Sequence, residues 1–211
     1  MTIQLGDTAP DFTAETTEGK LSLHEYLGHG WGVLFSHPAD YTPVCTTELG
    51  AFANRKAEFD QRNTKLIGVS VDTVESHNGW SADIEETQGS ALSYPLVGDE
   101  DRTVANLYGM IHPKALSTAT VRTVFIIGPD KQVKVTLTYP ASVGRNIDEI
   151  LRIVDALQLS VGAGVSTPVN WNLGDDVIVP PTLSDEDAAA KFPKGITTLK
   201  PYLRVTPQPD L

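Results

Sequence analysis

The chain has a single cysteine, Cys45, and the residues around it decide what its thiol can do. A lone free cysteine is more often a small, inert core residue. Here Thr42 and Pro43 signal the start of a helix, which places Cys45 in the first helical turn. Unpaired backbone N–H groups and the helix dipole favour an anion at that position. A reactive thiolate is therefore about as well supported as an inert core cysteine.

A single cysteine also limits the other chemistry that the chain can perform. It excludes an intramolecular disulfide and any zinc site with several thiolate ligands. The residue three positions after Cys45 is Glu48, so the Cys-x-x-Cys of a disulfide reductase is missing. The other histidines show no metal-ligand spacing with one another or with carboxylates; they are His24, His29, His77 and His112. We therefore predict no metal and no other cofactor. A thiol-based redox reaction would need its second thiol from another molecule.

The segment around the cysteine resembles a known family. Pro38, Thr42 and Cys45 are similar to the Pro-x-x-x-Thr-x-x-Cys motif of the peroxiredoxins. The resemblance covers almost the whole chain and is carried further by residues 121–130, 139–150, 167–171 and 192–195. The last two segments resemble the 1-Cys class, also called the peroxiredoxin-6 class. The absence of a second cysteine agrees with that class.

The resemblance implies a role for each residue of the motif. Cys45 would attack the O–O bond of a hydroperoxide, and the hydroxyl of Thr42 would hydrogen-bond the peroxide. Arg122 would hold both thiolate and peroxide, together with backbone N–H groups around Val44 and Cys45. Pro38 would cover the thiolate and limit water at the site.

His37, Glu48 and Arg145 are further candidates for the pocket. In the 1-Cys class the histidine at the position of His37 lines the pocket, although the sequence alone supports a packed or surface histidine at least as well. Glu48 follows Cys45 by one helical turn and is placed to orient a guanidinium, or else is an ordinary first-turn acid. Arg145 is a second guanidinium candidate, with a surface salt bridge as its alternative.

Acidity of the thiol cannot by itself make a fast peroxidase. An ordinary thiol with a pKa of about 8.5 is ~3% ionised at neutral pH, so full ionisation raises the rate by at most ~30-fold. Lowering a thiol pKa by roughly three units also weakens the nucleophile, and a Brønsted slope of ~0.4–0.5 cancels most of the gain. The remaining acceleration must come from positioning the O–O bond and stabilising charge on the leaving oxygen.

One stretch departs from the family pattern. Some members of this class carry a phospholipase A2 activity attributed to a serine in a Gly-x-Ser-x-Gly sequence. The matching stretch runs from Gly28 to Gly32 and has Gly30 at the serine position, although His24 and Asp130 match the proposed partners. Because the nucleophile is missing, we predict no lipase activity.

A strand–helix–strand unit must position the cysteine. Residues 32–36 and 66–71 are typical of buried strands, and the helix opened by Thr42 lies between them. Its apolar residues follow at helical spacing: Leu49, Phe52, Ala53 and Phe59. This is the unit of a parallel sheet, and it places Cys45 at the C-terminal edge of a strand, where α/β folds usually bind ligands.

The remaining pattern extends this unit into a complete fold. Helices are predicted near residues 74–86 and 102–108, strands over 121–127 and 133–139, and a closing helix after Asn146. Together these elements predict an α/β, thioredoxin-like sandwich with a mixed central sheet and flanking helices.

After about residue 161 the sequence becomes rich in Gly and Pro, with one short helix signalled at residues 184–187. The tail still carries apolar side chains that need a surface to pack on, namely Trp171, Phe192, Tyr202 and Leu203. We predict a peroxidase domain over residues 1–162 and a small C-terminal dimerisation domain over residues 163–211. The resemblance identifies the latter as a 1-Cys peroxiredoxin C-terminal domain and dimer arm.

Composition narrows the partners and the location. With 40% hydrophobic and 20% charged residues the chain is typical of soluble globular proteins. A net charge of −11 without a Lys/Arg cluster argues against nucleic-acid binding and stable membrane association. The first ten residues lack the features of a secretory signal or a transit peptide, so we expect a cytoplasmic protein.

Taken together, the residues and the resemblance predict an antioxidant enzyme of cell redox homeostasis. It would reduce hydrogen peroxide and organic hydroperoxides to water and alcohols through a Cys45 sulfenic acid, which an external thiol or other reductant resolves. The resemblance implies a homodimer in which each tail reaches over the other chain's active-site face; folding back onto its own domain is the alternative. The alternative function is a non-catalytic redox sensor or chaperone switched by oxidation of Cys45.

Overall fold

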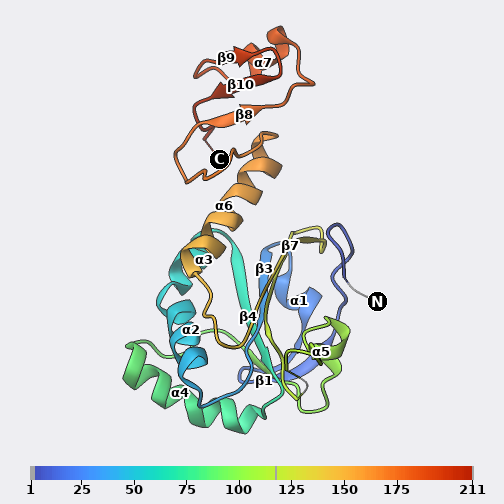
Figure 1. The fold of residues 1–211 in the computed structure, drawn as a ribbon, viewed down its shortest axis with the longest axis vertical. Helices are drawn as coiled ribbons and strands as arrows, with labels where there is room; N and C mark the ends of the chain where they lie inside the picture. The colour runs from blue at the N-terminus through green and yellow to red at the C-terminus, as the bar shows by residue number, and fades with distance from the viewer. Residues whose placement is uncertain (1–2, 117, 211) are drawn as a thin grey trace. The chain divides into compact units, whose positions relative to one another are not determined.

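The computed structural model describes residues 3–116 and 118–210 and divides the chain into two compact units, Met1–Ile147 and Asp148–Leu211 (Figure 1). Helix α6 (Ile147–Ala163) thus belongs almost entirely to the second unit, whereas the sequence places the division after residue 162. The domain boundary after residue 162 stays a prediction.

A seven-stranded sheet forms the centre of the first unit, in the order β2-β1-β5-β4-β3-β6-β7. Its strands are β1 (Thr13–Thr16), β2 (Gly19–Ser22), β3 (Trp31–Ser36), β4 (Thr64–Ser70), β5 (Leu96–Gly98), β6 (Arg122–Ile127) and β7 (Val133–Tyr139). Parallel pairing joins β3 to β4 and β4 to β5, and the other neighbours are antiparallel. The predicted mixed sheet is confirmed.

Helices cover both faces of this sheet. They are α1 (Leu23–Leu27), α2 (Pro43–Asn54), α3 (Lys56–Gln61), α4 (Val74–Gln88) and α5 (Thr103–Leu107). Figure 1 shows α2 and α4 beside one face and α1 and α5 beside the other. Strand β3 has a paired strand on each side, and all six of its residues are buried. Its apolar sequence therefore reflects a central position, from which the chain leads directly into the candidate site.

The predicted strand–helix–strand unit is present as β3, α2 and β4, in parallel register from Trp31 opposite Thr64 to Ser36 opposite Val69. The prediction of one continuous helix through Phe59 is wrong, because α2 ends at Asn54 and α3 begins at Lys56. Phe59 nevertheless packs on Phe52, with ring centroids 6.0 Å apart. The apolar spacing thus predicted the packing, which persists across the break, but not the break itself.

Other predicted elements of the first unit match closely. The expected helices near residues 74–86 and 102–108 correspond to α4 and α5. The expected strands over residues 121–127 and 133–139 correspond to β6 and β7, which pair antiparallel. The β1–β2 hairpin, α1 and β5 were not predicted. Each of these elements has five residues or fewer, which is too short to show a hydrophobic period.

The second unit has its own small core. It contains α6, α7 (Asp185–Lys191) and a three-stranded sheet of β8 (Val177–Val179), β10 (Leu203–Thr206) and β9 (Thr197–Lys200), in that order. The predicted short helix is α7, whose N-cap Ser184 accepts a hydrogen bond from the backbone N–H of Asp187. Trp171 and Phe192 are buried within this unit. Among the described residues, no helix is long and apolar enough to cross a membrane.

Candidate active site

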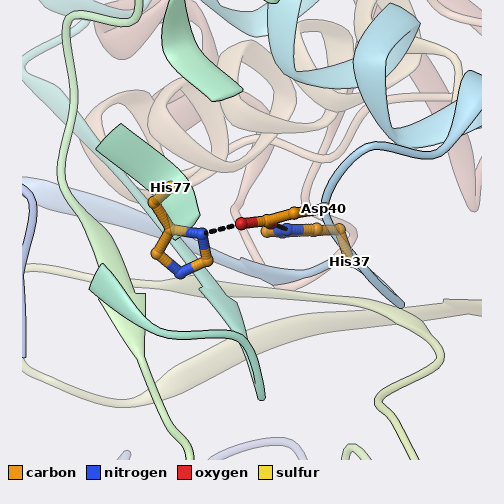
Figure 2. Close-up of side chains that lie close together, drawn as sticks. All are labelled: His37, Asp40 and His77. Atoms are coloured by element: carbon orange, nitrogen blue, oxygen red, sulfur yellow. Dashed lines mark hydrogen bonds and ion pairs between the residues drawn. The ribbon is translucent and has the colours of Figure 1, made fainter. Parts of the chain in front are cut away.

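The segment that joins β3 to α2 carries the first candidate residues, His37 and Pro38, and both are buried. The imidazole of His37 has no exposed surface, and its Nε2 lies 2.9 Å from Oδ1 of Asp40 (Figure 2). Burial lowers the pKa of His37, and the hydrogen bond from its ring to Asp40 offsets this only in part. His37 is therefore a packed, neutral histidine at neutral pH and not a surface one.

Asp40 also binds a second histidine, which the sequence gave no reason to select. Nδ1 of His77, at the start of α4, lies 2.7 Å from Oδ2 of Asp40. The sequence shows no metal-ligand spacing for His77, because the carboxylate that it contacts lies 37 residues earlier in the chain. Only the approach of α4 to the end of β3 brings His37, Asp40 and His77 together.

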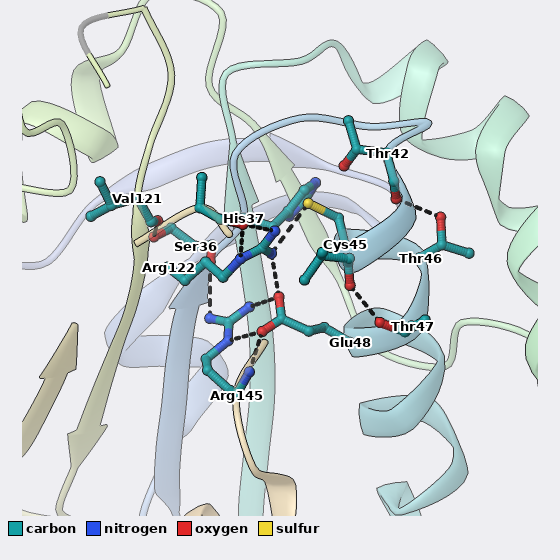
Figure 3. Close-up of polar contacts among 12 residues, drawn as sticks. Ser36, His37, Thr42, Cys45, Thr46, Thr47, Glu48, Val121, Arg122 and Arg145 are labelled. Atoms are coloured by element: carbon teal, nitrogen blue, oxygen red, sulfur yellow. Dashed lines mark hydrogen bonds and ion pairs between the residues drawn. The ribbon is translucent and has the colours of Figure 1, made fainter. Parts of the chain in front are cut away.

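Cys45 lies in the first turn of α2, as the sequence predicts, and its side chain is buried. An accessible sulfur is typical of a reactive thiol, whereas the side chain of Cys45 is 0% exposed. The sulfur is not enclosed by hydrocarbon alone, because Nη1 of Arg122 lies 3.3 Å from Sγ (Figure 3). This is a buried thiol with a cationic hydrogen-bond donor beside it.

Arg122 is the first residue of β6, and its guanidinium is held on two sides. Nε and Nη2 donate hydrogen bonds of 3.0 and 2.7 Å to the carbonyl oxygen of Ala141. Nη1 is left to face Sγ of Cys45 and a carboxylate oxygen of Glu48. The fork of donors therefore fixes the direction in which Nη1 points.

Glu48 joins the two buried arginines of the site. Its Oε2 accepts hydrogen bonds from Arg122 and from Nη2 of Arg145, and its Oε1 accepts from the backbone and Nε of Arg145. Burial alone would raise the pKa of Glu48, but the hydrogen bonds and charge of Arg145, and then the charge of Arg122, hold it below its usual value. Glu48 is thus an ionised residue that orients both guanidiniums.

Arg145 is buried, which rules out the alternative of a surface salt bridge. Its Nε and Nη2 each lie 2.8 Å from an oxygen of Glu48, and Nη1 donates to the carbonyl oxygen of Ser36 at 2.9 Å. Its guanidinium carbon lies 5.1 Å from the centre of the Phe35 ring. Arg145 thereby ties the end of β3 to α2.

The charged side chains of this cluster leave one positive charge in excess. Arg122 and Arg145 carry two positive charges, Glu48 carries one negative charge, and all three side chains are at most 3% exposed. Buried charges without a counter-charge are strongly destabilising. The sulfur of Cys45, next to Arg122 and at the start of α2, lies where this excess and the helix dipole favour a negative charge.

Thr42 occupies the N-cap position of α2, but its hydroxyl makes no capping hydrogen bond. Oγ1 donates a hydrogen bond of 2.8 Å to the carbonyl oxygen of Ala39 instead. The hydroxyl proton of Thr42 is therefore used in this hydrogen bond, and the lone pairs of Oγ1 remain as acceptors. Toward a peroxide, Thr42 can accept the hydroperoxide proton while Arg122 donates.

Comparison with known proteins places this arrangement in a family. Residues 5–136 match the AhpC/TSA family, and residues 156–195 match the C-terminal domain of 1-Cys peroxiredoxin. A 1-Cys peroxiredoxin of Dictyostelium discoideum is 52% identical over 208 residues, which cover 99% of this chain and 86% of the relative.

Solved structures agree over both units. A yeast mitochondrial 1-Cys peroxiredoxin, described with a thiol resolving mechanism via glutathione/thioredoxin systems, has a TM-score of 0.90 at 49% identity and covers 98% of this chain and 100% of its own. A cysteine-to-serine mutant of peroxiredoxin 6 from Arenicola marina has a TM-score of 0.91 at 45% identity, covering 99% and 100%.

These matches confirm the fold and the kind of enzyme that the sequence predicts. They span nearly the full chain, and the one cysteine lies inside the matched family segment. Its sulfur lies beside a buried, oriented arginine. The chain belongs to the AhpC/TSA family and, within it, to the 1-Cys peroxiredoxins, which are thiol-dependent peroxidases.

Proposed function

We propose that Cys45, Arg122 and Thr42 carry out the peroxidase reaction. The thiolate of Cys45 attacks the terminal oxygen of a hydroperoxide, so that an S–O bond forms as the O–O bond breaks. The sulfur loses two electrons, and the leaving oxygen gains them and takes up one proton to become water or an alcohol. The observation that carries this proposal is the 3.3 Å contact between Nη1 of Arg122 and Sγ.

Arg122 and Thr42 divide the work of binding the peroxide. Arg122 is aimed by Ala141 and Glu48, so it can stabilise charge on the leaving oxygen without first reorienting. Thr42 accepts the hydroperoxide proton and so sets the line of attack. Pro38, buried beside His37, limits water near the sulfur.

Replacement of the cysteine tests the proposal. Cys45→Ser should lose all turnover of hydrogen peroxide in the presence of excess reductant and remain folded, and Cys45 of the wild type should gain the mass of one oxygen after one equivalent of peroxide. Continued turnover by Cys45→Ser would refute the assignment. A wild type that stops after one equivalent, with reductant still present, would favour a redox sensor or chaperone instead.

We also propose that an external thiol resolves the sulfenic acid, with glutathione and thioredoxin as the candidates. The chain has no second cysteine, and both systems are named for the yeast mitochondrial relative. Turnover assays with each reductant in turn, followed by mass measurement of Cys45, would separate them. A mixed disulfide with glutathione at Cys45 is the intermediate that we expect.

We further propose that the enzyme is a homodimer that assembles through its second unit. Large apolar side chains are exposed there, among them Val169 at 88% and Tyr202 at 73%. All four residues of the edge strand β9 are exposed as well. Sedimentation velocity at micromolar concentration should give twice the chain mass, and Tyr202→Glu should weaken the dimer. A wild-type monomer would contradict this proposal.

For the cellular location we propose the cytoplasm. A sulfenic acid that is resolved by an external thiol needs a compartment that keeps thiols reduced. One of the similar proteins is mitochondrial, and mitochondria are therefore the alternative. Fractionation with markers for both compartments decides between them.

A further inference from the structure

A second buried polar cluster lies next to the cysteine site. His37 follows β3, Asp40 precedes α2, and His77 lies in the first turns of α4 (Figure 2). Both imidazoles are 0% exposed, and the Asp40 side chain is 1% exposed. Asp40 accepts from both rings, with one oxygen facing each.

The hydrogen-bond partners of His77 determine its protons. Its Nε2 lies 3.1 Å from the carbonyl oxygen of Val97, which can only accept. Its Nδ1 faces Asp40, whose carboxylate also accepts from the hydroxyl of Ser76 at 2.7 Å. Burial raises the pKa of Asp40, but the hydrogen bonds of His37 and His77 hold it well below its usual value, so Asp40 is ionised. Both nitrogens of His77 therefore carry a proton.

The same reasoning fixes the proton of His37. Its Nε2 faces the ionised Asp40 and must donate, so a neutral ring leaves Nδ1 without a proton. Nδ1 is buried and has no hydrogen-bond partner among the described residues. A buried acceptor without a partner destabilises a protein unless a ligand fills it.

The main chain of His37 is tied to the elements that carry the cysteine site. Its carbonyl oxygen accepts a hydrogen bond of 2.7 Å from Thr120, two residues before Arg122. The preceding residue, Ser36, accepts from Arg145 at 2.9 Å. Figure 3 accordingly draws His37 among the residues of the cysteine site.

A metal is the competing explanation for this cluster, because the three ligand atoms lie within 4.8 Å of one another. Each ring nitrogen that faces Asp40, however, is already at direct hydrogen-bond distance from it, 2.9 Å for His37 and 2.7 Å for His77. A cation would have to displace both protons and would lie beside a fully buried pair of rings. The hydrogen-bonded arrangement satisfies Asp40 and His77 without one.

We propose that Asp40 and His77 are positioning residues of the peroxidase, which fix the proton of His37 on Nε2 and so keep Nδ1 as an acceptor for a protonated oxygen at the cysteine site. The oxygen is that of a hydroperoxide, whose proton Nδ1 would share with Oγ1 of Thr42, or that of the Cys45 sulfenic acid. The hydrogen bonds from both rings keep Asp40 ionised, and the ionised Asp40 in turn fixes the proton of His37. This inference rests on the site proposed above.

Nitrogen NMR of the full-length, reduced protein labelled with ¹⁵N-histidine tests the proton assignment independently of activity. At neutral pH we expect His37 to carry its proton on Nε2 only and His77 to carry protons on both nitrogens. The variant His29→Gln, at an exposed position, should leave both patterns unchanged. A proton on Nδ1 of His37 in the wild type would overturn the proposal. So would stoichiometric zinc binding that is lost in His77→Gln.

Rates of Cys45 oxidation test the consequence for catalysis. Asp40→Asn should mix the two forms of His37 and slow oxidation by roughly 10²-fold, since a wrong histidine tautomer disables proton handling. Ser76→Ala removes one hydrogen bond to Asp40 without changing the protons of either ring, and should keep both the NMR pattern and the rate within about twofold. Equal slowing in both variants, or slow oxidation with an unchanged His37 pattern, would contradict the proposal. If the wild type had no peroxidase activity, the site assignment would fail while the NMR result still stood.

Discussion

Arg122 presents a single nitrogen to Cys45: Nη1 lies 3.3 Å from Sγ, while Nε and Nη2 are bound to Ala141. A lysine at this position would keep the charge but lose the fork that directs it. We therefore expect Arg122→Lys to oxidise Cys45 about 10² to 10³ times more slowly than the wild type, the range seen when one donor of an oriented site is lost. Stopped-flow measurement of the first oxidation step provides the test.

The control for this prediction is Arg152→Lys. Arg152 pairs with Glu149 on the surface of α6, where the arginine side chain is 30% exposed. Its replacement should leave the rate of Cys45 oxidation unchanged. A wild-type rate in Arg122→Lys would show that a positive charge near the sulfur is sufficient and that the direction of its donor is not required.

Removal of the Glu48 charge should destabilise the fold. Glu48→Gln leaves Arg122 and Arg145 buried together without a carboxylate, and breaking a buried ion pair from one side typically costs about 3–5 kcal/mol. The free energy of unfolding from urea titration measures this loss. Glu149→Gln, in the partly exposed pair with Arg152, should cost less than about 1 kcal/mol. Equal losses in the two variants would refute the structural role of Glu48.

Acidification should weaken the fold in two stages. The pKa of His37 is lowered by burial from its usual 6.5, so below that pH the unfolded chain binds a proton that the folded protein does not, and stability falls. The pKa of Glu48 is lowered from 4.5 by Arg145, and that of Asp40 from 3.8 by the two histidines, in each case against the effect of burial. The stability that Glu48 and Asp40 contribute is fully present above their usual pKa values. It is lost as the pH falls through their lower pKa values in the folded protein.

Urea unfolding at pH 7.5, 6, 5 and 4 checks this dependence. We expect stability to begin to fall below about pH 6.5 and to fall more steeply below about pH 4.5. His37→Gln should remove the first decline and Glu48→Gln part of the second. A decline below about pH 6.5 that is the same in His37→Gln as in the wild type would contradict the neutral, buried state of His37.

The sequence predicted those parts of the fold and site that depend on local pattern. Buried β3, the start of α2 at Pro43 and the apolar stripe of α6 each follow from residues within one or two turns or one strand. The position of Cys45 in the first helical turn followed from the same local signal. Short elements such as β5, with three residues, gave no period to detect.

Contacts between distant segments could not be predicted from pattern. Glu48 and Arg145 are 97 residues apart, and only the fold showed that they share two hydrogen bonds between side chains in the core. Asp40 and His77 meet in the same way, across two separate α/β connections. The contact between Cys45 and Arg122 likewise joins residues 77 positions apart, and no local signal describes it.

The orientation of the Thr42 hydroxyl leads to a graded prediction. Oγ1 donates to Ala39, so its contribution to peroxide binding is as an acceptor. Thr42→Ser keeps this oxygen and should retain the rate of Cys45 oxidation within about threefold, whereas Thr42→Val removes it and should slow the reaction by about 10² or more. Thr47→Val, which removes an exposed hydroxyl of the same helix, is the matched control. A Thr42→Val rate equal to that of Thr47→Val would exclude Thr42 from the reaction.

The glycine at position 30 leads to a prediction about the lipase activity of some class members. A Cβ atom on Gly30 would lie 2.9 Å from the carbonyl oxygen of Asn63, closer than real contacts allow. His24 is occupied as well, because its Nε2 lies 2.7 Å from the carbonyl oxygen of Ala9. Restoring the serine therefore should not restore a working triad, since its side chain lacks space and its base is bound elsewhere.

We expect Gly30→Ser to lose about 1–3 kcal/mol of stability, as an overpacked backbone contact does, and to gain no hydrolysis of phospholipid ester bonds. His29→Ser, at the exposed neighbouring position, should be close to neutral on both measures. Fatty-acid release from phospholipid vesicles and urea unfolding of both variants provide the measurements. A stable Gly30→Ser protein that released fatty acid would mean that Asn63 and His24 move readily, and that the missing serine alone separates this chain from lipase activity.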